Sequence, residues 1–299
     1  MPERLALPCW AKLNYTLDVL SQRPDGFHDL SSVVQTVSLY DRLEIELAAG
    51  PAVELACDAP GVPPGESNLA VRAARAIATR AGYRGGVRLK LRKRIPAQAG
   101  LGGGSSDAAQ TLRGLDRLLG LNLPAPDLAA LAAELGSDVP LFLTAGTCRM
   151  DGRGDRVTPL PEGPTLWFVI ARPPVGLSTA EAYARLDAIP DRRSARATER
   201  MVRALASGVV EEVTAAMVND FEQVAIEMEP RVAVAMDDLR MARARKVRLC
   251  GSGSAVFGVA HSEAEAQAVA ALARLRYPDL AVCRAVSRAE ALVLGADAE

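Results

Sequence analysis

Residues 96–106 of this 299-residue sequence read Pro96-Ala97-Gln98-Ala99-Gly100-Leu101-Gly102-Gly103-Gly104-Ser105-Ser106. Four of the five residues from position 100 to 104 are glycine, which loses more conformational entropy on folding than any other residue. So many glycines are expected where the backbone must approach a ligand closely with its N–H groups exposed. A helix predicted from Ser105 onward would point its unpaired N–H groups and its positive dipole end into the same space. The segment therefore predicts an anion-binding loop that suits a nucleotide phosphate.

Two common glycine motifs do not fit this segment. The P-loop pattern ends in Gly-Lys-Ser/Thr, and no lysine follows Gly104. The dinucleotide-binding fingerprint G-x-G-x-x-G would need its third glycine at Ser105 or at Asp107, depending on the register. From the residues alone, the remaining alternative is a flexible turn in front of a helix.

Composition limits the classes of protein to which the chain can belong. Hydrophobic residues make up 49% of its 299 residues, so the chain can bury a large core, and its length suits two packed domains. Its formal net charge is −1, so no bulk positive field attracts nucleic acid or an anionic membrane surface. The basic run from Arg88 to Arg94 could meet a compact anion, but we favour the solvated face of an alternating strand.

The cysteines and the N-terminus indicate the compartment. The sequence holds five cysteines, Cys9, Cys57, Cys148, Cys250 and Cys283. Their odd number and scattered spacing argue against a disulfide framework or a zinc site, and favour reduced thiols. Pro8 and Lys12 interrupt the short apolar stretch at the N-terminus, and no apolar run approaches the roughly 18 residues of a membrane-spanning helix. We therefore expect a cytoplasmic protein with no membrane and no nucleic-acid partner.

Hydrophobic periodicity predicts the secondary structure along the chain. It predicts strands at residues 33–39, 42–47, 87–91, 166–171, 247–249, 256–259 and 281–285, and a hairpin at 149–160. It predicts helices at residues 68–81, 105–119, 127–135, 179–186, 193–207, 209–227 and 262–275, and a helical turn at 137–143. Strand runs mixed with helix runs, without strict alternation, indicate an α+β fold. We place a domain boundary near residue 160, which gives domains 1–160 and 161–299.

Residues 96–109 resemble the P-x-x-x-G-L-G-(G)-G-S-S-x-A-A signature of the GHMP kinases, named for galactokinase, homoserine kinase, mevalonate kinase and phosphomevalonate kinase. The resemblance implies a two-domain α+β fold with the active-site cleft between the domains. It also implies that the loop wraps the triphosphate of ATP, with Ser105 or Ser106 near a Mg²⁺ ion. Gln98 stands where small residues are usual, and we expect a modest effect on the loop.

Two charged residues lie in short segments that could serve catalysis. Lys12 is part of Ala11-Lys12-Leu13-Asn14 in front of an expected strand, and Asp138 lies in Gly136-Ser137-Asp138-Val139-Pro140. Taken alone, Lys12 could be a surface charge, and Asp138 could stabilise a helix dipole. The pair resembles the catalytic pair of the 4-diphosphocytidyl-2-C-methyl-D-erythritol kinase family. That resemblance implies that Asp138 accepts the proton of the substrate hydroxyl, while Lys12 stabilises the charge that develops on the attacking oxygen.

The segment Arg23-Pro24-Asp25-Gly26-Phe27-His28 resembles the R-x-D-G-Y-H segment of the same family. The resemblance implies that Phe27 and Tyr183 sandwich a cytosine ring, and that His28 bonds its polar edge. Phe27 replaces the usual tyrosine, which keeps the stacking face and loses a hydroxyl. A loop histidine bonded to backbone is the alternative for His28. Asn14, with Lys12, would face the methylerythritol end of the substrate.

Three further segments match the family with less specificity. Asn68 begins an N-L-x-x-R-A-A stretch placed beside adenine, although an asparagine before an apolar helix is also an ordinary N-cap. Residues 249–257 hold the glycine loop Gly251-Ser252-Gly253, which resembles the third GHMP motif. The resemblance implies a loop that packs beside the first glycine loop and shapes the cleft, whereas spacing alone could equally indicate a hairpin turn. Residues 219–222 match an N-D-x-E pattern, which we interpret first as part of a helix.

The favoured interpretation is a kinase of a small cytidine-linked alcohol that needs ATP and Mg²⁺ and works as a monomer or homodimer. Two alternatives stay open. A mevalonate or homoserine kinase would not require the cytidine group. A non-catalytic nucleotide-binding regulator on the same fold should lack the base or the lysine, yet Asp138 and Lys12 are both present.

Overall fold

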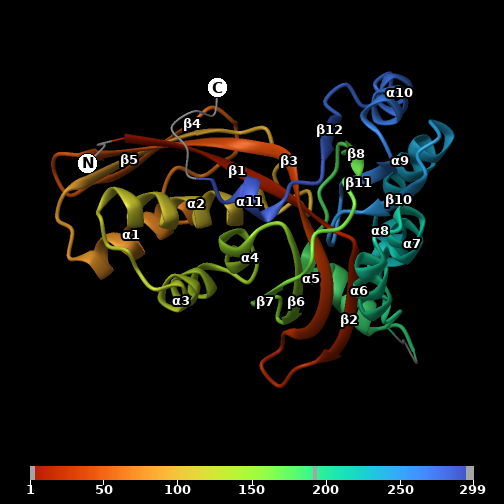
Figure 1. The fold of residues 1–299 in the computed structure, drawn as a ribbon, viewed down its shortest axis with the longest axis horizontal. Helices are drawn as coiled ribbons and strands as arrows, with labels where there is room; N and C mark the ends of the chain where they lie inside the picture. Colours follow the sequence, from red (N-terminus) through yellow and green to blue (C-terminus); the bar gives the residue numbers. More distant parts are fainter. Residues whose placement is uncertain (1–3, 191–193, 294–299) are drawn as a thin grey trace.

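The structure is a computed structural model that describes residues 4–190 and 194–293. Within these residues the largest layer is an eight-stranded sheet centred on β3, which pairs with β1, β2, β5 and β6 (Figure 1). Its strands are β1 (Arg4–Asn14), β2 (Thr16–Gln22), β3 (His28–Ala48), β4 (Val53–Cys57), β5 (Gly86–Arg92), β6 (Thr147–Gly152), β7 (Arg156–Pro159) and β9 (Val218–Asn219). The pairings around β3 are antiparallel, whereas β4 joins β5 and β9 joins β2 in parallel.

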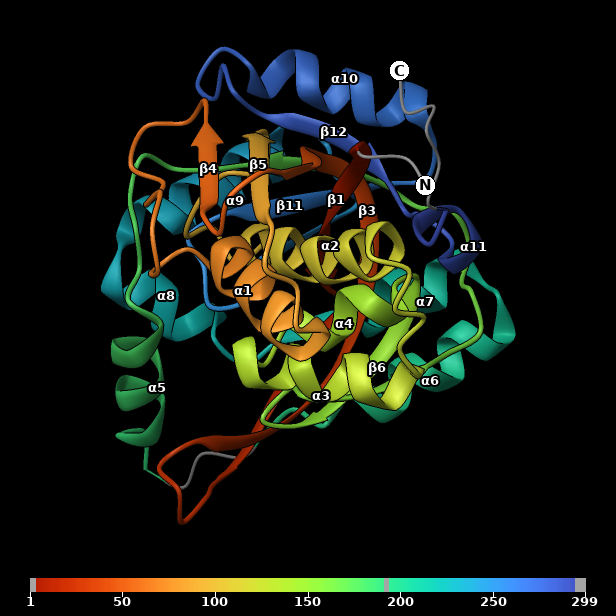
Figure 2. The same cartoon turned by 90° about the vertical axis from the view of Figure 1, so that its left-hand side faces the viewer.

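Helices cover one face of this sheet and build the first core (Figures 1 and 2). They are α1 (Leu69–Ala81), α2 (Gly103–Leu118), α3 (Ala125–Leu135) and α4 (Val139–Thr144). Leu112 and Leu115 of α2 are fully buried with Leu43 and Ile45 of β3 in one apolar cluster. Burial of this surface fixes α2 on the sheet, and so fixes where the glycine-rich segment before it can lie.

A smaller sheet forms the second layer. In the described part of the chain it has four antiparallel strands, in the order β10–β11–β8–β12. These strands are β8 (Trp167–Ala171), β10 (Lys246–Leu249), β11 (Val256–Ala260) and β12 (Ala281–Arg284). The helices of this half are α5 (Thr179–Asp187), α6 (Ala197–Ser207), α7 (Val210–Ala216), α8 (Glu222–Met228), α9 (Pro230–Met241), α10 (Glu263–Ala273) and α11 (Arg288–Ala291). Among them, α9 and α10 pack on the sheet.

Later parts of the chain return to the large sheet. Strand β9 extends it beside β2, and Ala285 forms an isolated bridge with Val37. Arg113 of α2 donates a hydrogen bond of 2.7 Å to the carbonyl of Leu292, just beyond α11. Segments after residue 160 therefore contact β2, β3 and α2, which all precede it. The domain boundary near residue 160 stays a prediction.

The expected strands at 33–39 and 42–47 form one continuous strand, β3. Asp41, expected to separate them, is fully buried, and its carboxylate accepts a 2.8 Å hydrogen bond from the backbone N–H of Ile95. A buried carboxylate with bonded partners can stay inside a strand. The irregularity of β3 lies at residues 38–39, because the neighbouring β1 residues Trp10 and Ala11 pair with Tyr40 and Val37. Lys12 lies within β1, and its segment 11–14 directly precedes the next strand, β2, as expected.

The expected single helix at 209–227 is wrong. The chain forms α7, then the short strand β9, then α8, because Val218 and Asn219 pair with Thr16 and Leu17 of β2. The N-D-x-E segment is therefore a strand end and a turn. Helix α3 begins at Ala125 with Pro124 as its N-cap, so Asp127 lies in the first turn instead of capping it.

Other helix predictions are confirmed or extended. Asn68 caps α1, accepting a 2.9 Å bond from Ala70 N, and Gly82 ends it in the left-handed conformation. The sequence did not predict α9. Helix α6 begins at Ala197, and the expected start at 193 falls outside the described residues. Among the residues described, no helix has the length and apolar character that crossing a bilayer requires.

Candidate active site

The glycine-rich loop joins β5 to α2 and lines a pocket of about 620 Å³. Gly102 is the N-cap of α2 with φ 72°, and its carbonyl accepts the first helical bond, 2.9 Å from Ser106 N. Every loop residue from Pro96 to Ser105 lines this pocket, as does Asn68. Ser106 does not: it is fully buried, and within the described residues its hydroxyl has no hydrogen-bond partner.

Gln98, which stands where small residues are usual, has an uncommon backbone conformation. Its φ is 54°, in the left-handed region that glycine adopts without steric cost. The side chain is tolerated because residue 98 lies where this pocket meets a second one, and it lines both. Any residue other than glycine would carry this backbone strain at position 98, and the side chain of Gln98 forms part of the wall of both pockets.

A buried ion cluster holds the two ends of the loop together. The Lys93 ammonium, at the start of the loop, bonds Asp41 of β3 and, at 2.8 Å, Asp107 of α2. Burial raises the pKa of the Asp107 carboxyl, and the ammonium beside it opposes that rise. Burial also lowers the pKa of Lys93, but the two carboxylates outweigh this and raise it overall. The alternating basic residues before it, Arg88 and Lys90, are exposed, as expected for a solvated strand face.

The second glycine loop packs directly on the first. A Cβ atom placed on Gly100 would lie 1.9 Å from the carbonyl oxygen of Cys250, and φ at Gly100 is 78°. A Cβ on Gly251 would lie 3.1 Å from the carbonyl oxygen of Gly100. Both glycines are therefore required by close backbone approach. The segment 250–255 connects the two strands of the β10–β11 hairpin, as the alternative expected, and it also packs against the glycine-rich loop at residues 96–106 (the phosphate loop).

We expect Gly100→Ala to lower the free energy of unfolding by about 2 kcal/mol or more, since it combines left-handed strain with a backbone clash. Gly104→Ala is the matched control in the same loop. Gly104 lies in the first turn of α2, and a Cβ atom placed on it would meet nothing closer than 4.0 Å, a methyl of Leu69. It should be neutral or stabilise by up to about 1 kcal/mol. Thermal and urea unfolding of both variants measures this, and equal stability would contradict the tight contact between the loops.

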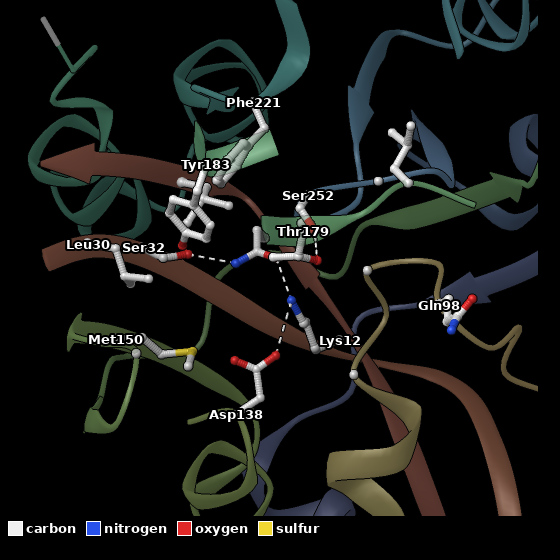
Figure 3. Close-up of a pocket in the computed structure, with 18 of the residues that line it drawn as sticks. Lys12, Leu30, Ser32, Gln98, Asp138, Met150, Thr179, Tyr183, Phe221 and Ser252 are labelled. Carbon is white, nitrogen blue, oxygen red and sulfur yellow. Dashed lines mark hydrogen bonds and ion pairs between the residues drawn. The ribbon is translucent and has the colours of Figure 1, made fainter. Parts of the chain in front are cut away.

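Lys12 and Asp138 meet beside these loops in a second pocket of about 750 Å³ (Figure 3). The Lys12 Nζ donates a 2.7 Å bond to Asn14 Oδ1 and lies 3.6 Å from Asp138 Oδ2. Asn14 in turn donates to Ser32 Oγ at 2.8 Å. The Lys12 side chain is only 7% exposed, and its backbone N–H donates to the phosphate-loop carbonyl of Leu101. Both the backbone and the ammonium of Lys12 are thus held in place.

Asp138 precedes α4, but its side chain bonds none of the helix N–H groups. The carboxylate oxygens of Asp138 are therefore not used in bonds to the helix. The side chain is 38% exposed, and it lines the pocket. Gly100 and Gly102 of the phosphate loop line the same pocket. The arrangement places a carboxylate and a cation beside an anion-binding backbone. It suits proton removal from a hydroxyl that attacks a bound phosphate.

A third pocket, of about 440 Å³, collects the aromatic residues. The His28 ring stacks on Tyr183 with centroids 4.6 Å apart, and its Nε2 donates to Asp187 at 2.8 Å. Phe27 is 53% exposed, and the Arg153 guanidinium lies 4.9 Å from its ring centroid. Phe27 and Tyr183 both line this pocket, but it is His28 that stacks on Tyr183, so the cytosine sandwich stays a prediction. His28 contacts a carboxylate side chain, which the backbone-bonded alternative did not foresee.

Tyr183 joins this pocket to the one that holds Lys12 and Asp138, because it lines both. Burial raises its pKa to about 12, so its hydroxyl keeps its proton at neutral pH. Sequence reasoning missed Arg153, Asp187 and Phe221, whose ring meets Tyr183 edge-on at 4.8 Å. Arg153 and Asp187 carry no local signal, since a hairpin turn and a helix end bring them to the aromatic pocket.

Comparison with family models places both halves of the chain. Residues 68–146 match the GHMP kinases N terminal domain, and residues 201–279 match the GHMP kinases C terminal. A 4-diphosphocytidyl-2-C-methyl-D-erythritol kinase from Moorella thermoacetica is 40% identical over 282 residues, which cover 94% of this chain and 98% of the relative. A kinase of the same name from Bacillus subtilis is 38% identical over 263 residues, covering 87% and 89%.

Solved structures show the same relationship. The crystal structure of a 4-(cytidine 5'-diphospho)-2C-methyl-D-erythritol kinase superposes with a TM-score of 0.80 and 34% identity, covering 95% of this chain and 100% of that one. The L. major mevalonate kinase, solved with R-mevalonate, superposes with a TM-score of 0.75 at 13% identity, covering 94% and 96%. The second likeness is one of fold alone.

Proposed function

The chain belongs to the 4-diphosphocytidyl-2-C-methyl-D-erythritol kinases of the GHMP superfamily, and from this premise we propose how its residues perform the reaction. It is a phosphotransferase of the non-mevalonate isoprenoid pathway that uses ATP to phosphorylate the 2-hydroxyl of 4-diphosphocytidyl-2-C-methyl-D-erythritol. The observation that carries the mechanism is the pocket that Lys12 and Asp138 share with the phosphate loop.

Asp138 is the general base in this proposal. The substrate hydroxyl donates to a carboxylate oxygen, its oxygen attacks the γ-phosphorus, and the proton passes to Asp138 as the new bond forms. The bond from the γ-phosphorus to the bridging oxygen breaks, and ADP leaves with that electron pair. The Lys12 ammonium, 3.6 Å from the carboxylate, lies where it can also contact the attacking oxygen and stabilise its charge. Asn14 orients that ammonium through its 2.7 Å bond.

The nucleotide side of the proposal uses the loop from Pro96 to Ser105. Its backbone N–H groups and the N-terminus of α2 receive the triphosphate. Asn68 lines the same pocket, at the place where the adenine of ATP would lie. Bound Mg²⁺ would neutralise charge on the phosphates. Such an ion keeps few protein ligands besides phosphate oxygens and water. The half-buried Ser105, which lines the pocket, fits that role better than the fully buried Ser106.

The cytidine end of the substrate fits the aromatic pocket. Phe27 is 53% exposed with the Arg153 guanidinium over its ring, and His28 is oriented by Asp187. Tyr183 connects this pocket with the catalytic one, so a substrate can reach from one to the other. Because the His28 ring already stacks on Tyr183, cytosine would enter between Phe27 and the His28–Tyr183 pair, or displace His28 from that stack.

A coupled ADP-release assay tests this function. We expect turnover of the cytidine-linked alcohol with ATP and Mg²⁺, and turnover at least about 10⁴-fold less efficient with mevalonate or homoserine. Mevalonate and homoserine carry no cytosine, so they would leave the aromatic pocket empty. A site built to hydrogen-bond a substrate group rejects an analogue that lacks this group by a factor of about 10⁴. Activity on mevalonate or homoserine alone would overturn the substrate assignment. Nucleotide binding without any turnover would favour the regulator instead.

Two coarser features complete the proposal. The five cysteines are free thiols, which suits the cytoplasm where we place the reaction. The chain is expected to act as a monomer or a homodimer on a small molecule, and light scattering on the purified protein would decide between them.

A further inference from the structure

The turn at residues 219–222, between β9 and α8, has no part in the mechanism above. Asn219 is 5% exposed, and its amide Nδ2 donates to two backbone carbonyls, Gly251 O at 2.7 Å and Leu249 O at 3.0 Å. Its Oδ1 accepts a 2.9 Å bond from Phe221 N. The Gly251 carbonyl lies in the second glycine loop, and the Leu249 carbonyl lies at the end of β10, just before that loop. One buried side chain therefore satisfies both backbone carbonyls.

The loop that Asn219 holds touches the catalytic machinery. A Cβ on Gly251 would lie 3.5 Å from Lys12 Nζ and 3.1 Å from Gly100 O, so the Gly251 backbone is packed against both. Gly251 and Gly253 have φ of 55° and 99°, conformations that glycine adopts readily and also leaves readily. Glu222 of the same turn adds a second anchor by accepting a 3.1 Å bond from Leu249 N.

The same turn supports the aromatic side of the site. Phe221, whose N–H is bonded to Asn219, lines the pocket of Lys12 and Asp138 and packs edge-on against Tyr183 (Figure 3). One turn thus fixes the glycine loop on one side and the wall of the substrate pocket on the other. The glycine loop and Tyr183 are both distant from this turn in sequence.

We propose that Asn219 is a positioning residue for the phosphoryl transfer, which holds loop 250–253 against Gly100 and Lys12. The inference rests on the function proposed above. Without the amide, the buried carbonyls of Leu249 and Gly251 lose this donor. The bonds that remain, such as Cys250 N to Ala255 O and Gly253 N to Cys250 O, do not involve the Gly251 carbonyl. The Gly251 backbone is then free to move away from the Lys12 ammonium and from Gly100 of the phosphate loop, both of which it is packed against.

Asn219→Ala tests the proposal when it is compared with Gln35→Ala. Gln35 is a matched buried amide: it is 2% exposed and donates to Thr36 O and Val286 O, each at 2.9 Å, but lines none of the three pockets. We expect Asn219→Ala to lower kcat by about 10- to 100-fold. It should also weaken binding of the non-hydrolysable analogue AMP-PNP by about threefold or more. Amide exchange across residues 249–255 should be faster.

Gln35→Ala should lose comparable thermal stability yet keep kcat and AMP-PNP affinity within about twofold. The proposal is overturned if Asn219→Ala keeps wild-type kcat and exchange, or if Gln35→Ala loses as much kcat. Should the alanine variant fail to fold, Asn219→Ser retains one donor and is expected to show intermediate defects. A wild-type protein inactive on the cytidine-linked alcohol would defeat the proposed function, while exchange and AMP-PNP binding would still decide the role of Asn219.

Discussion

Replacing Asp138 with asparagine is expected to lower kcat by about 10²- to 10⁴-fold while ATP binding persists. The amide has the size and shape of the carboxylate, so the pocket keeps its form, but it cannot take the hydroxyl proton. The side chain caps no backbone N–H of α4, so the substitution removes no helix bond. Steady-state kinetics combined with calorimetric binding of AMP-PNP separates the loss of turnover from any loss of affinity.

The control for this variant is Asp127→Asn. Asp127 is also a carboxylate at the start of a helix, but it lies on the surface, 3.4 Å from Arg80. Exposed pairs of this kind contribute about 0 to 1 kcal/mol, so stability and kcat should both stay close to wild type. Full activity in Asp138→Asn would remove Asp138 from the role of base. A loss of AMP-PNP affinity equal to the loss in kcat would assign it to binding.

Local sequence was enough to identify the glycine-rich loop, because its pattern lies in adjacent residues. Four glycines followed by a helix start can be recognised without tertiary information, and residues Pro96 to Ser105 line one pocket in front of α2. The helix cap at Asn68 was readable for the same reason. Ser106 shows the limit of this reasoning, since helical rotation turns it into the core while its neighbour Ser105 lines the pocket.

Features that depend on contacts between distant segments of the chain could not be predicted from local sequence. Residues 209–227 carry helical spacing, but the strand β9 within them forms only because β2, far earlier in the chain, offers an open edge. Asn219 looked like helix sequence for this reason. The contact of Gly100 with Cys250 likewise joins segments that share no local pattern. The packing of the two glycine loops was expected only from the family resemblance, because no local pattern in either loop encodes it.

Substrate recognition lies between these cases. The residues Phe27, His28 and Tyr183 were identified from family resemblance, and they line one pocket. Their mutual arrangement depends on Asp187 and Arg153, which fix His28 and cover Phe27 through tertiary contacts. A sequence pattern gives the identity of such residues, but the orientation of their rings follows from the neighbours that the fold supplies.

Lys12→Ala is expected to lower kcat by about 10²- to 10³-fold and to change ATP affinity far less. Lys12 is a buried cation whose Nζ contacts Asn14 and Asp138, and it does not line the nucleotide pocket that Asn68 lines. Its charge therefore matters most when the attacking oxygen becomes negative. Lys90→Ala, an exposed lysine of β5, serves as the control and should leave both constants unchanged.

The double variant Lys12→Ala/Asp138→Asn gives the sharpest test of the pair. If the two groups act on one proton transfer, the second substitution removes little that the first has left, so the combined loss in kcat should stay close to that of the more severe single variant. Losses that multiply would mean that Lys12 and Asp138 work in separate steps, despite their separation of only 3.6 Å. A Lys12→Ala enzyme with normal kcat and a raised KM for ATP would place the lysine in nucleotide binding instead.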